Sequence, residues 1–582
     1  MTSSVPSSSS TTTTTTTTKR MSDAAAAAAT AAATAAAKGG IAWGGSLVGS
    51  KNPHNLGYRY STPHKRFRAA GASDDGSNDK LDLPTNVVVQ FSNRQGEELA
   101  DVLDLPTNST MDDLNALLHS LLNDTDRDNN KRIPYSFYAK LPHSKEHPEL
   151  LEDVEITTES LATFLLEHQV STEQTLQITY QPMAVFRVRP ITRCTDTLPG
   201  HTEAVLHVSY SPNGRHLASG GGDTTVRFWD VHTNLPKYTC RKHKDHVLCT
   251  AWSPDGTKFA SVDKRGVLIL WNPQTGESIG APIQAHKQWI TSLAWEPLHC
   301  NKSCDRIVTA GKDGTAKVWN VRTRKHIKTL AGHTDSIECV KWGGENLIYT
   351  ASRDRTIKVW NATQDVNRLG ILVRTLKGHG HRVNTLALSS DYICRTGPFD
   401  PNDKKLLLQK DNHDSDKLYE LAKARYQEFQ QSSCPQETLV SGSDDYTLFV
   451  WNPVTSKHPL KRLTGHQNLI NHISFSPDGR FFASASFDKK VKLWNGLTGE
   501  FLVTLTGHVG AVYQVAWSAD SQYIVSASAD STAKLWNAAK SKKQAIETLP
   551  GHADQVFALD WSPNGASVAT GSKDRTLKIW KH

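Results

Sequence analysis

A tryptophan recurs about every 42 residues through the C-terminal two-thirds of the chain, a period in the range of repeat architectures. Each one closes a short apolar segment, usually before Asp or Asn: Trp229, Trp271, Trp319, Trp360, Trp451, Trp494, Trp536 and Trp580. An Asp stands upstream of each Trp, at an expected spacing of six residues: Asp223, Asp263, Asp313, Asp354, Asp445, Asp488, Asp530 and Asp574. A His, mostly preceded by Gly, stands further upstream: His201, His243, His286, His333, His379, His466, His508 and His552. The chain therefore repeats one supersecondary unit.

These eight sets resemble WD repeats, which implies an all-β propeller with four strands in each blade. Residues 184–582 are therefore expected to form an eight-bladed WD-repeat β-propeller. The strand at CTDTL, just before His201, is expected to complete the last blade and so close the ring.

The repeated His, Asp and Trp are expected to be structural rather than catalytic. Each blade must tie its outer loop to its inner turn, and these side chains can do so by hydrogen bonding with a strand Ser or Thr. Buried polar groups of this kind stabilise a fold only when all of them have partners.

One interval breaks the period, because Trp360 and Trp451 lie 91 residues apart. It holds a single Gly-His and a single Asp–Trp pair, so we interpret it as one blade with an insertion at about residues 393–437. Within it, DSDKLYELAKARYQEFQ predicts an exposed helix that begins at Asp414. A docking element and a flexible loop are both open interpretations.

Residues 86–183 predict a second, smaller domain. The segments NVVVQF, ADVLDL, PYSFYAKL, DVEI and TLQITY alternate as strands, and MDDLNALLHSLLN and SLATFLLEH have helical spacing. Thr110 offers a hydroxyl as N-cap of the first helix. The order β-β-α-β-β-α-β at this length favours an α+β ubiquitin-like β-grasp fold.

Residues 1–85 are rich in Ser, Thr and Ala and predict a disordered low-complexity tail. Its HKRFR cluster, residues 64–68, is either a nuclear-localisation patch or a solvated basic patch. The whole chain has no apolar run of about 18 residues, so no transmembrane helix is expected and no membrane partner is predicted.

Charge is segregated along the chain. Residues 86–183 hold 6 Lys and Arg against 17 Asp and Glu, a net charge of −11, whereas residues 184–582 carry a net charge of +15. The first domain therefore suits cations or basic surfaces, and the second suits polyanions.

Three segments imitate sites with chemistry. HSKEH, residues 143–147, matches a zinc-protease pattern, but Pro142 and Pro148 bracket it and predict a loop rather than the helix that zinc binding needs. DTDRDNN, residues 124–130, begins like a calcium loop without its glycine. His299, Cys300 and Cys304 lack a fourth ligand. We therefore expect no enzyme activity and no cofactor of the protein's own.

Longer segments carry a closer resemblance, among them QPMAVFRVRPITRC, HKQWITSLAWEPLH and GHQNLINHISFSPDGRFFASASFDKKVKLW. An acidic ubiquitin-like domain joined to eight WD repeats resembles the Notchless family of ribosome assembly factors over about residues 86–582. This resemblance implies a monomer that acts on pre-60S particles in the nucleus, both nucleolus and nucleoplasm. It also implies that the ubiquitin-like (NLE) domain binds the MIDAS domain of the AAA ATPase midasin.

In the family, one Glu of this domain completes the coordination of the Mg²⁺ ion that the MIDAS holds. The corresponding position is Glu173, in STEQTLQITY. An open magnesium site favours a hard oxygen donor, and Asp, one methylene shorter, should reach it poorly. Without the resemblance, Glu173 would be interpreted as a surface acid in a turn.

The basic propeller suits docking on pre-ribosomal RNA and proteins, where phosphate contacts supply affinity. The residue before each blade Asp should lie on the binding face, which selects Lys312, Arg353 and Lys573. Aromatic residues at the starts of strands add Trp289, Tyr513 and Phe557. Solvated surface side chains are the alternative interpretation. A different function, as a scaffold in Notch signalling or a ubiquitin-ligase substrate adaptor, also suits a WD propeller.

Overall fold

The computed structural model describes residues 85–93, 99, 102–122, 135–144, 147–156, 161–168, 170, 175–182, 188–401, 414–432, 435–538 and 543–582. Contacts divide the chain into two units, with the boundary between Met183 and Ala184. The tail expected over residues 1–85, including HKRFR, falls outside the described residues apart from its last position, and so does DTDRDNN. No helix among the described residues is long and apolar enough to cross a membrane.

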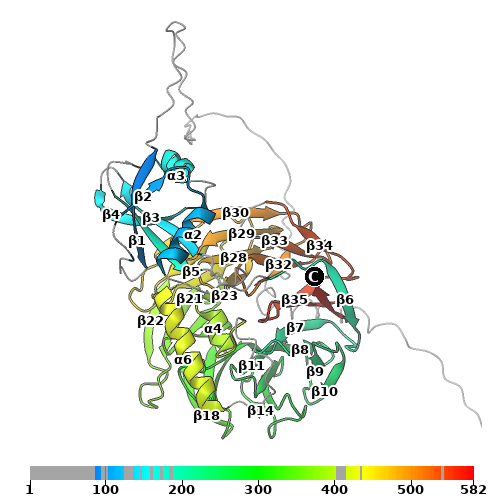
Figure 1. Ribbon diagram of the computed structural model, residues 1–582. Helices are drawn as coiled ribbons and strands as arrows, with labels where there is room; N and C mark the ends of the chain where they lie inside the picture. Colours follow the sequence, from blue (N-terminus) through cyan, green and yellow to red (C-terminus); the bar gives the residue numbers. More distant parts are fainter. Residues whose placement is uncertain are drawn as a thin grey trace, which may run out of the picture. The chain divides into compact units, whose positions relative to one another are not determined.

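The smaller unit is a mixed α/β domain with one five-stranded sheet (Figure 1). Its elements follow the predicted order: β1 (Asn86–Asn93), β2 (Leu103–Pro106), α2 (Met111–Leu121), β3 (Tyr135–Ser144), β4 (His147–Glu155), α3 (Leu161–His168) and β5 (Leu176–Pro182). The strand order is β2-β1-β5-β3-β4, and the central pair β1 and β5 is parallel. The first and last strands of the domain therefore lie side by side.

Helix α2 shows why the local sequence folds as predicted. The Thr110 hydroxyl accepts a hydrogen bond from the Asp113 amide, and the Asp113 carboxylate accepts one from the Thr110 amide, which forms a capping box. Leu114 and Leu118, one turn apart, are buried in a core shared with Phe137 and Phe164. The helix is therefore held by its cap and by one apolar face.

The prediction of a loop at HSKEH, residues 143–147, is wrong at both ends of the segment. His143 and Ser144 continue β3, and His147 begins β4, where it pairs with Ser144. The two His therefore belong to facing strands of a hairpin, and neither lies on a helix, so the segment cannot form the zinc motif that it imitates. Pro142 and Pro148 are accommodated within the strands instead of ending them.

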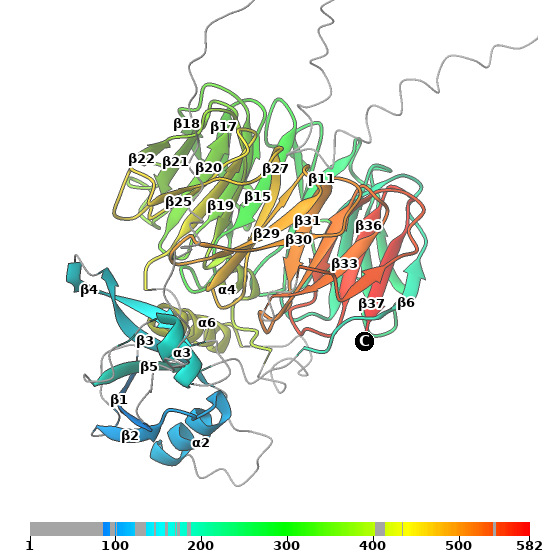
Figure 2. The ribbon, with the colours of Figure 1, turned by 90° about the horizontal axis from the view of Figure 1, so that it is seen from above.

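The larger unit contains eight four-stranded antiparallel sheets in its described residues (Figures 1 and 2). The first five sheets contain β7 (Val205–Tyr210), β8 (His216–Gly221), β9 (Val226–Asp230), β10 (Pro236–Cys240); β11 (Val247–Trp252), β12 (Phe259–Asp263), β13 (Val267–Trp271), β14 (Ile283–Gln284); β15 (Ile290–Trp295), β16 (Arg306–Gly311), β17 (Thr315–Asn320), β18 (Lys325–Ala331); β19 (Ile337–Trp342), β20 (Leu347–Ser352), β21 (Thr356–Asn361), β22 (Leu372–Lys377); and β23 (Val383–Leu388), β24 (Leu439–Ser443), β25 (Leu448–Trp451), β26 (Lys461–Leu463). The last three contain β27 (Ile470–Phe475), β28 (Phe481–Ser486), β29 (Lys490–Asn495), β30 (Phe501–Thr506); β31 (Val512–Trp517), β32 (Tyr523–Ser528), β33 (Ala533–Asn537), β34 (Glu547–Leu549); and β35 (Val556–Trp561), β36 (Val568–Ser572), β37 (Leu577–Lys581), β6 (Arg193–Leu198).

The strand predicted at CTDTL is present as β6, and it joins the last sheet by pairing with β37 (Figure 2). Leu198 lies opposite Leu577, so residues from the two ends of the unit share one sheet. The first strand of each sheet contacts the first strand of the next, and β35 of the eighth sheet contacts β7 of the first. We call this first strand the inner strand.

The fifth sheet carries the inserted segment between β23 and β24. It includes a short helix, α4 (Asp391–Thr396), and a longer one, α6 (Ser415–Ser432), which lie on the same side of the sheets in Figure 2. The exposed helix predicted from Asp414 is present, but one of its faces is buried. Leu418, Ala422, Tyr426 and Phe429 form that face, and the Tyr426 ring stacks on His299 at 3.9 Å between centroids.

The inserted segment returns to the sheet at Glu437, a buried carboxylate. Its oxygens accept hydrogen bonds from the Gly344 amide at 2.8 Å and from the Tyr349 hydroxyl at 2.8 Å, and it also accepts one from Ser390. Burial raises the pKa of Glu437, although these donors oppose the shift. The end of the insertion is thus tied to the fourth sheet.

Helix α4 braces sheets that are far apart in sequence. The Arg395 guanidinium donates to both Asp560 oxygens, at 2.9 and 2.8 Å, and the Lys341 ammonium pairs with Asp391 at 2.9 Å. The Tyr392 hydroxyl donates to the Pro563 carbonyl at 3.2 Å. One helical turn therefore connects the fourth, fifth and eighth sheets.

We expect Arg395→Ala to destabilise the larger unit by about 2–3 kcal/mol, because Asp560 would remain buried without its cation. The measurement is the urea midpoint of the full-length protein, followed by tryptophan fluorescence. The matched control is Arg368→Ala, whose partner Asp365 lies 3.8 Å away and is exposed, so its loss should be below about 1 kcal/mol. Equal effects of the two variants would contradict the bracing role.

Candidate functional site

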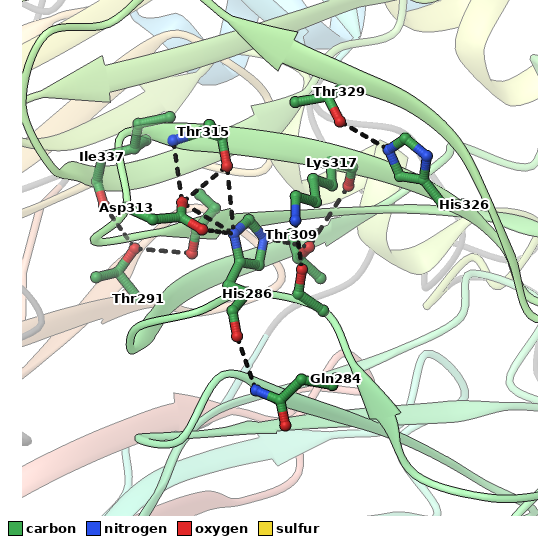
Figure 3. Close-up of polar contacts among 12 residues, drawn as sticks. Gln284, His286, Thr291, Thr309, Asp313, Thr315, Lys317, His326, Thr329 and Ile337 are labelled. Atoms are coloured by element: carbon green, nitrogen blue, oxygen red, sulfur yellow. Dashed lines mark hydrogen bonds and ion pairs between the residues drawn. The ribbon is translucent and has the colours of Figure 1, made fainter.

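In the third sheet, the repeated His and Asp meet a strand hydroxyl, as Figure 3 shows for His286, Asp313 and Thr309. His286 Nδ1 lies 3.0 Å from the Asp313 carboxylate, and its Nε2 lies 2.9 Å from the Thr309 hydroxyl. The Trp319 indole N–H donates to the same hydroxyl at 3.1 Å. Asp313 also accepts a hydrogen bond of 2.7 Å from Thr315. Every polar atom of the group is thus paired, which is the condition for stability inside a protein.

The same four-residue network occurs in each of the eight sheets. The His Nδ1 lies 2.7–3.0 Å from its Asp throughout. The hydroxyl that links the His to the Trp comes from the second strand: Ser219, Ser261, Thr309, Thr350, Ser441, Ser484, Ser526 and Thr570.

The second sheet reaches this geometry by a different spacing. Asp263 lies eight residues before Trp271, so the expected spacing of six is wrong there. Its carboxylate still lies 3.0 Å from His243 Nδ1, and it also accepts hydrogen bonds from the Arg265 and Val267 amides. The Asp therefore ends strand β12, and the residue after it, Lys264, takes the place that precedes the Asp in other sheets.

Burial by itself raises the pKa of the network Asp carboxyls, but the opposing interactions are stronger. Hydrogen bonds and charge from the paired His, and hydrogen bonds from Thr side chains and backbone amides, hold the pKa well below the usual range. This holds for Asp223, Asp313, Asp354, Asp445, Asp530 and Asp574. The network therefore stabilises the fold with its carboxylates ionised.

One end of the sheets forms a regular surface, which we call the loop face. In every sheet, the amide of the residue after the second strand donates to the carbonyl of the residue before the inner strand. The donors are Gly222, Lys264, Lys312, Arg353, Asp444, Phe487, Ala529 and Lys573, and the acceptors are Ala204, His246, Trp289, Ser336, Arg382, Leu469, Ala511 and Gln555.

The structure places Lys312, Arg353, Lys573 and Trp289 on the loop face. Lys573 is paired with Asp554 at 3.3 Å. Tyr513 and Phe557 lie one residue inside the inner strands, and Phe557 is only 5% exposed, packed with Leu206 and Leu248. Phe557 is therefore part of an apolar cluster between the inner strands rather than an exposed contact.

Lys264 belongs to the loop face and is missing from the sequence-based set. The rule that selects the residue before each Asp selects Val262 in the second sheet, because Asp263 is displaced. The Trp–Asp spacing of eight, together with the DKRG turn, is the signal that could have identified Lys264 in advance.

The inner strands surround a cavity of about 450 Å³. His207 and His472 lie on its wall, and burial lowers their pKa to about 4 and about 3, so both are neutral at pH 7. Tyr392 and Arg395 of α4 also line the cavity, together with the last residues of the inner strands. Helix α4 thus covers the end of the cavity away from the loop face.

The remaining sequence candidates do not assemble into a site among the described residues. Cys300 donates to the Gly344 carbonyl, and Cys304 is fully buried. No group of three or more His, Cys, Asp or Glu in the described part of the chain could hold a metal ion. Glu173 lies outside the described residues, in the segment between α3 and β5.

Two family profiles match the chain. The profile for the WD domain, G-beta repeat, matches residues 192–230, 234–272, 277–320, 324–361, 457–495, 499–537 and 543–581. These seven segments leave out residues 362–456, which hold β22 of the fourth sheet, β23 to β25 of the fifth sheet and the insertion. The NLE (NUC135) domain profile matches residues 87–144, in the smaller unit.

Relatives match most of the chain. It is 48% identical to the Notchless protein homolog of Arabidopsis thaliana, over 72% of this chain and 81% of that protein. It is 45% identical to Protein Notchless of Drosophila melanogaster, over 68% of this chain and 75% of that protein. It is 39% identical to Ribosome assembly protein 4 of Saccharomyces cerevisiae, over 73% and 80%.

A solved structure supports the fold of the larger unit. The computationally designed Ika8 protein matches with a TM-score of 0.50 and 25% identity, over 66% of this chain and 98% of that one. The repeated networks and the two profiles define a non-enzymatic WD-repeat scaffold that carries an NLE domain. Within that class, the chain belongs to the Notchless family, as identities of 39–48% to its members show.

The network makes stability depend on pH. Because the folded-state pKa of Asp530 is below the unfolded value of about 3.9, its contribution is complete above about pH 5 and is lost as the pH falls towards the folded value. Asp530→Asn should lose about 1–3 kcal/mol at pH 7 and show a weaker dependence of stability on acid. Urea midpoints measured from pH 7 to pH 2 test this.

The control for the acid titration is Asp416→Asn on α6, whose side chain is 65% exposed. It should reproduce the wild-type pH dependence. If Asp530→Asn kept the full acid dependence of the wild-type protein, the network carboxylate would not be its source.

Proposed function

We propose that this protein is an assembly factor for the large ribosomal subunit that works in the nucleolus and nucleoplasm. The observation that carries the proposal is the match to Ribosome assembly protein 4, which spans 428 residues. That span is longer than residues 184–582, so it extends beyond the WD unit towards the NLE domain. Together with the NLE profile match at residues 87–144, it supports a proposal for the two units together.

We assign the larger unit the role of docking on the pre-60S particle as a closed eight-bladed propeller. Support comes from its eight sheets, from the pairing of β6 with β37 and from its net charge of +15. A basic surface gains affinity for RNA through phosphate contacts and the release of counterions.

We assign the smaller unit, as a ubiquitin-like domain, the role of binding the MIDAS domain of a midasin-type AAA ATPase. Support comes from its net charge of −11. Further support comes from the position of Glu173 just before β5, the strand that pairs in parallel with β1 at the centre of the sheet. The metal belongs to the partner, and Glu173 would supply one carboxylate oxygen to it. ATP hydrolysis by the partner would then pull on the docked propeller.

The Glu173 assignment predicts that Glu173→Ala loses Mg²⁺-dependent binding to an isolated midasin MIDAS domain. Glu173→Asp should also bind at least about tenfold more weakly, because its carboxylate lies one methylene nearer the backbone. Calorimetric titrations with Mg²⁺ and with EDTA measure both. The matched control is Glu167→Ala, an acid on α3 with the same charge change. Unchanged affinity of Glu173→Ala would refute the ligand role.

The docking assignment is tested separately by sedimentation of nuclear extract. The wild-type protein and Glu173→Ala should both sediment with pre-60S particles, since docking requires the larger unit alone. Sedimentation with ubiquitin-ligase or receptor complexes instead would favour the scaffold function in signalling.

A further inference from the structure

We propose that the loop face binds a single-stranded segment of RNA, with one base stacked on Trp289 and its phosphates held by Lys264, Lys312 and Arg353. This proposal deepens the proposed function by naming the ligand class of the larger unit. It concerns a direct contact that can be measured with purified components.

Trp289 is the centre of the proposed site. It stands just before inner strand β15, its side chain is half-buried, and its carbonyl accepts the Lys312 amide at 2.8 Å. The Lys312 ammonium lies 4.0 Å from the ring centroid and that of Lys264 lies 4.5 Å from it. Both ammonium groups therefore lie over the indole ring as cation–π partners, one from the second sheet and one from the third. When RNA binds, the flexible lysine side chains would move from the ring to the phosphates, and a base would take their place on the indole.

The charges of this region differ from those elsewhere on the loop face. Lys264, Lys312 and Arg353 come from three consecutive sheets, and within the described residues the structure shows no ion pair for any of them. By contrast, Lys573 pairs with Asp554 at 3.3 Å, and Arg382 pairs with Asp444. Three cations that form no ion pair in the described part of the chain thus make a continuous arc beside Trp289, with Glu338 as a buried counter-charge.

The electrostatics of Lys312 agree with that arc. Burial lowers the pKa of Lys312, Glu338 opposes the shift, and Arg353 and Lys264 add to it by repulsion. The counter-charge is buried as well: Glu338 accepts a hydrogen bond from Ser336, and burial raises its pKa. A polyanion lying over the arc would relieve this repulsion, whereas a neutral ligand would not.

The open end of the central cavity and a second pair of aromatic rings also favour the loop face as the RNA-binding surface. The opposite end of the central cavity is covered by α4, so the loop face is the end at which a chain can approach the inner strands. Farther round this face, Phe487 and Tyr513 have ring centroids 5.7 Å apart, and both side chains are half-buried. These rings offer a second aromatic surface outside the basic arc.

Single-stranded RNA fits these features better than two other polyanions. In a duplex the faces of the bases are hidden in the stack, so Trp289 would have no partner. An acidic peptide would satisfy the cations but has no base to place on the indole. Stacking combined with phosphate contacts is the usual means by which proteins bind single strands.

The experiment measures binding of a fluorescein-labelled 12-nucleotide single-stranded RNA to the full-length protein by anisotropy, at several salt concentrations. Trp289→Ala should weaken binding about 5- to 100-fold, the range for loss of one stacked base. Lys264→Glu and Lys312→Glu should each weaken it and reduce the salt slope by at least about 0.7. Unchanged urea midpoints of these variants would show that the fold is retained.

The matched control is Lys237→Glu. Lys237 also lies over an aromatic ring, that of Tyr238 at 5.5 Å, but on the outer strand β10 of the first sheet. The same charge change there should leave the affinity within about twofold. An equal loss would mean that overall charge, and not the arc, determines binding, and would overturn the proposal.

Three further outcomes would overturn it: equal binding of a duplex of the same length, full affinity of Trp289→Ala, and complete displacement of the RNA by an acidic peptide at equimolar concentration. None of these outcomes depends on whether the protein sediments with pre-60S particles. Loss of that sedimentation with RNA binding intact would refute the proposed function and leave the RNA site standing.

Discussion

The hydrogen bond between a buried imidazole and a largely buried Asp carboxylate, repeated eight times, is the interaction on which the larger unit depends. A sheet of four short strands has too little apolar surface to be stable alone, so each must be tied within itself and packed on its neighbours. The His bridges the loop Asp and the strand hydroxyl, and the hydroxyl accepts the indole N–H. One imidazole thus connects the loop before the inner strand to the second strand and, through its hydroxyl, to the Trp of the third strand. The same bonds set the loops from which the loop face is built.

Helix α4 changes what the repeat alone would produce. Eight equal sheets would leave the central cavity accessible at both ends, whereas the insertion in the fifth sheet places Arg395 and Tyr392 across one of them. The ion pair of Arg395 with Asp560 joins residues 165 positions apart in the sequence. The two ends of the cavity are therefore chemically different, with a buried ionic brace at one and the loop face at the other. Such an asymmetry allows a scaffold to hold different partners on its different faces.

The loop face itself is divided. Sheets two to four contribute Lys264, Lys312 and Arg353 as amide donors, while sheets six and seven contribute Phe487 and Ala529 at the equivalent positions, with Leu469 and Ala511 as their acceptors. Identical backbone geometry thus carries a basic arc on one side and an apolar arc on the other. Because the backbone bonds do not depend on these side chains, the face can vary in sequence without cost to the fold.

The sequence by itself determined the repeat, the order of elements in both units and the residues of the blade networks, since these depend on local periodicity and on side chains that recur at nearly fixed intervals. The capped helix at Thr110 and the strand at CTDTL belong to this class. Only the tertiary structure decided which loop residues share a face, because that depends on strand ends rather than on spacing. Because Asp263 is displaced by two residues, the spacing rule missed Lys264. Phe557, which the sequence suggested as an exposed binding residue, is buried. The tertiary structure also decided that one face of α6 is buried, since the residues packed against it, Leu298 and His299, belong to the third sheet and lie far from α6 in the sequence.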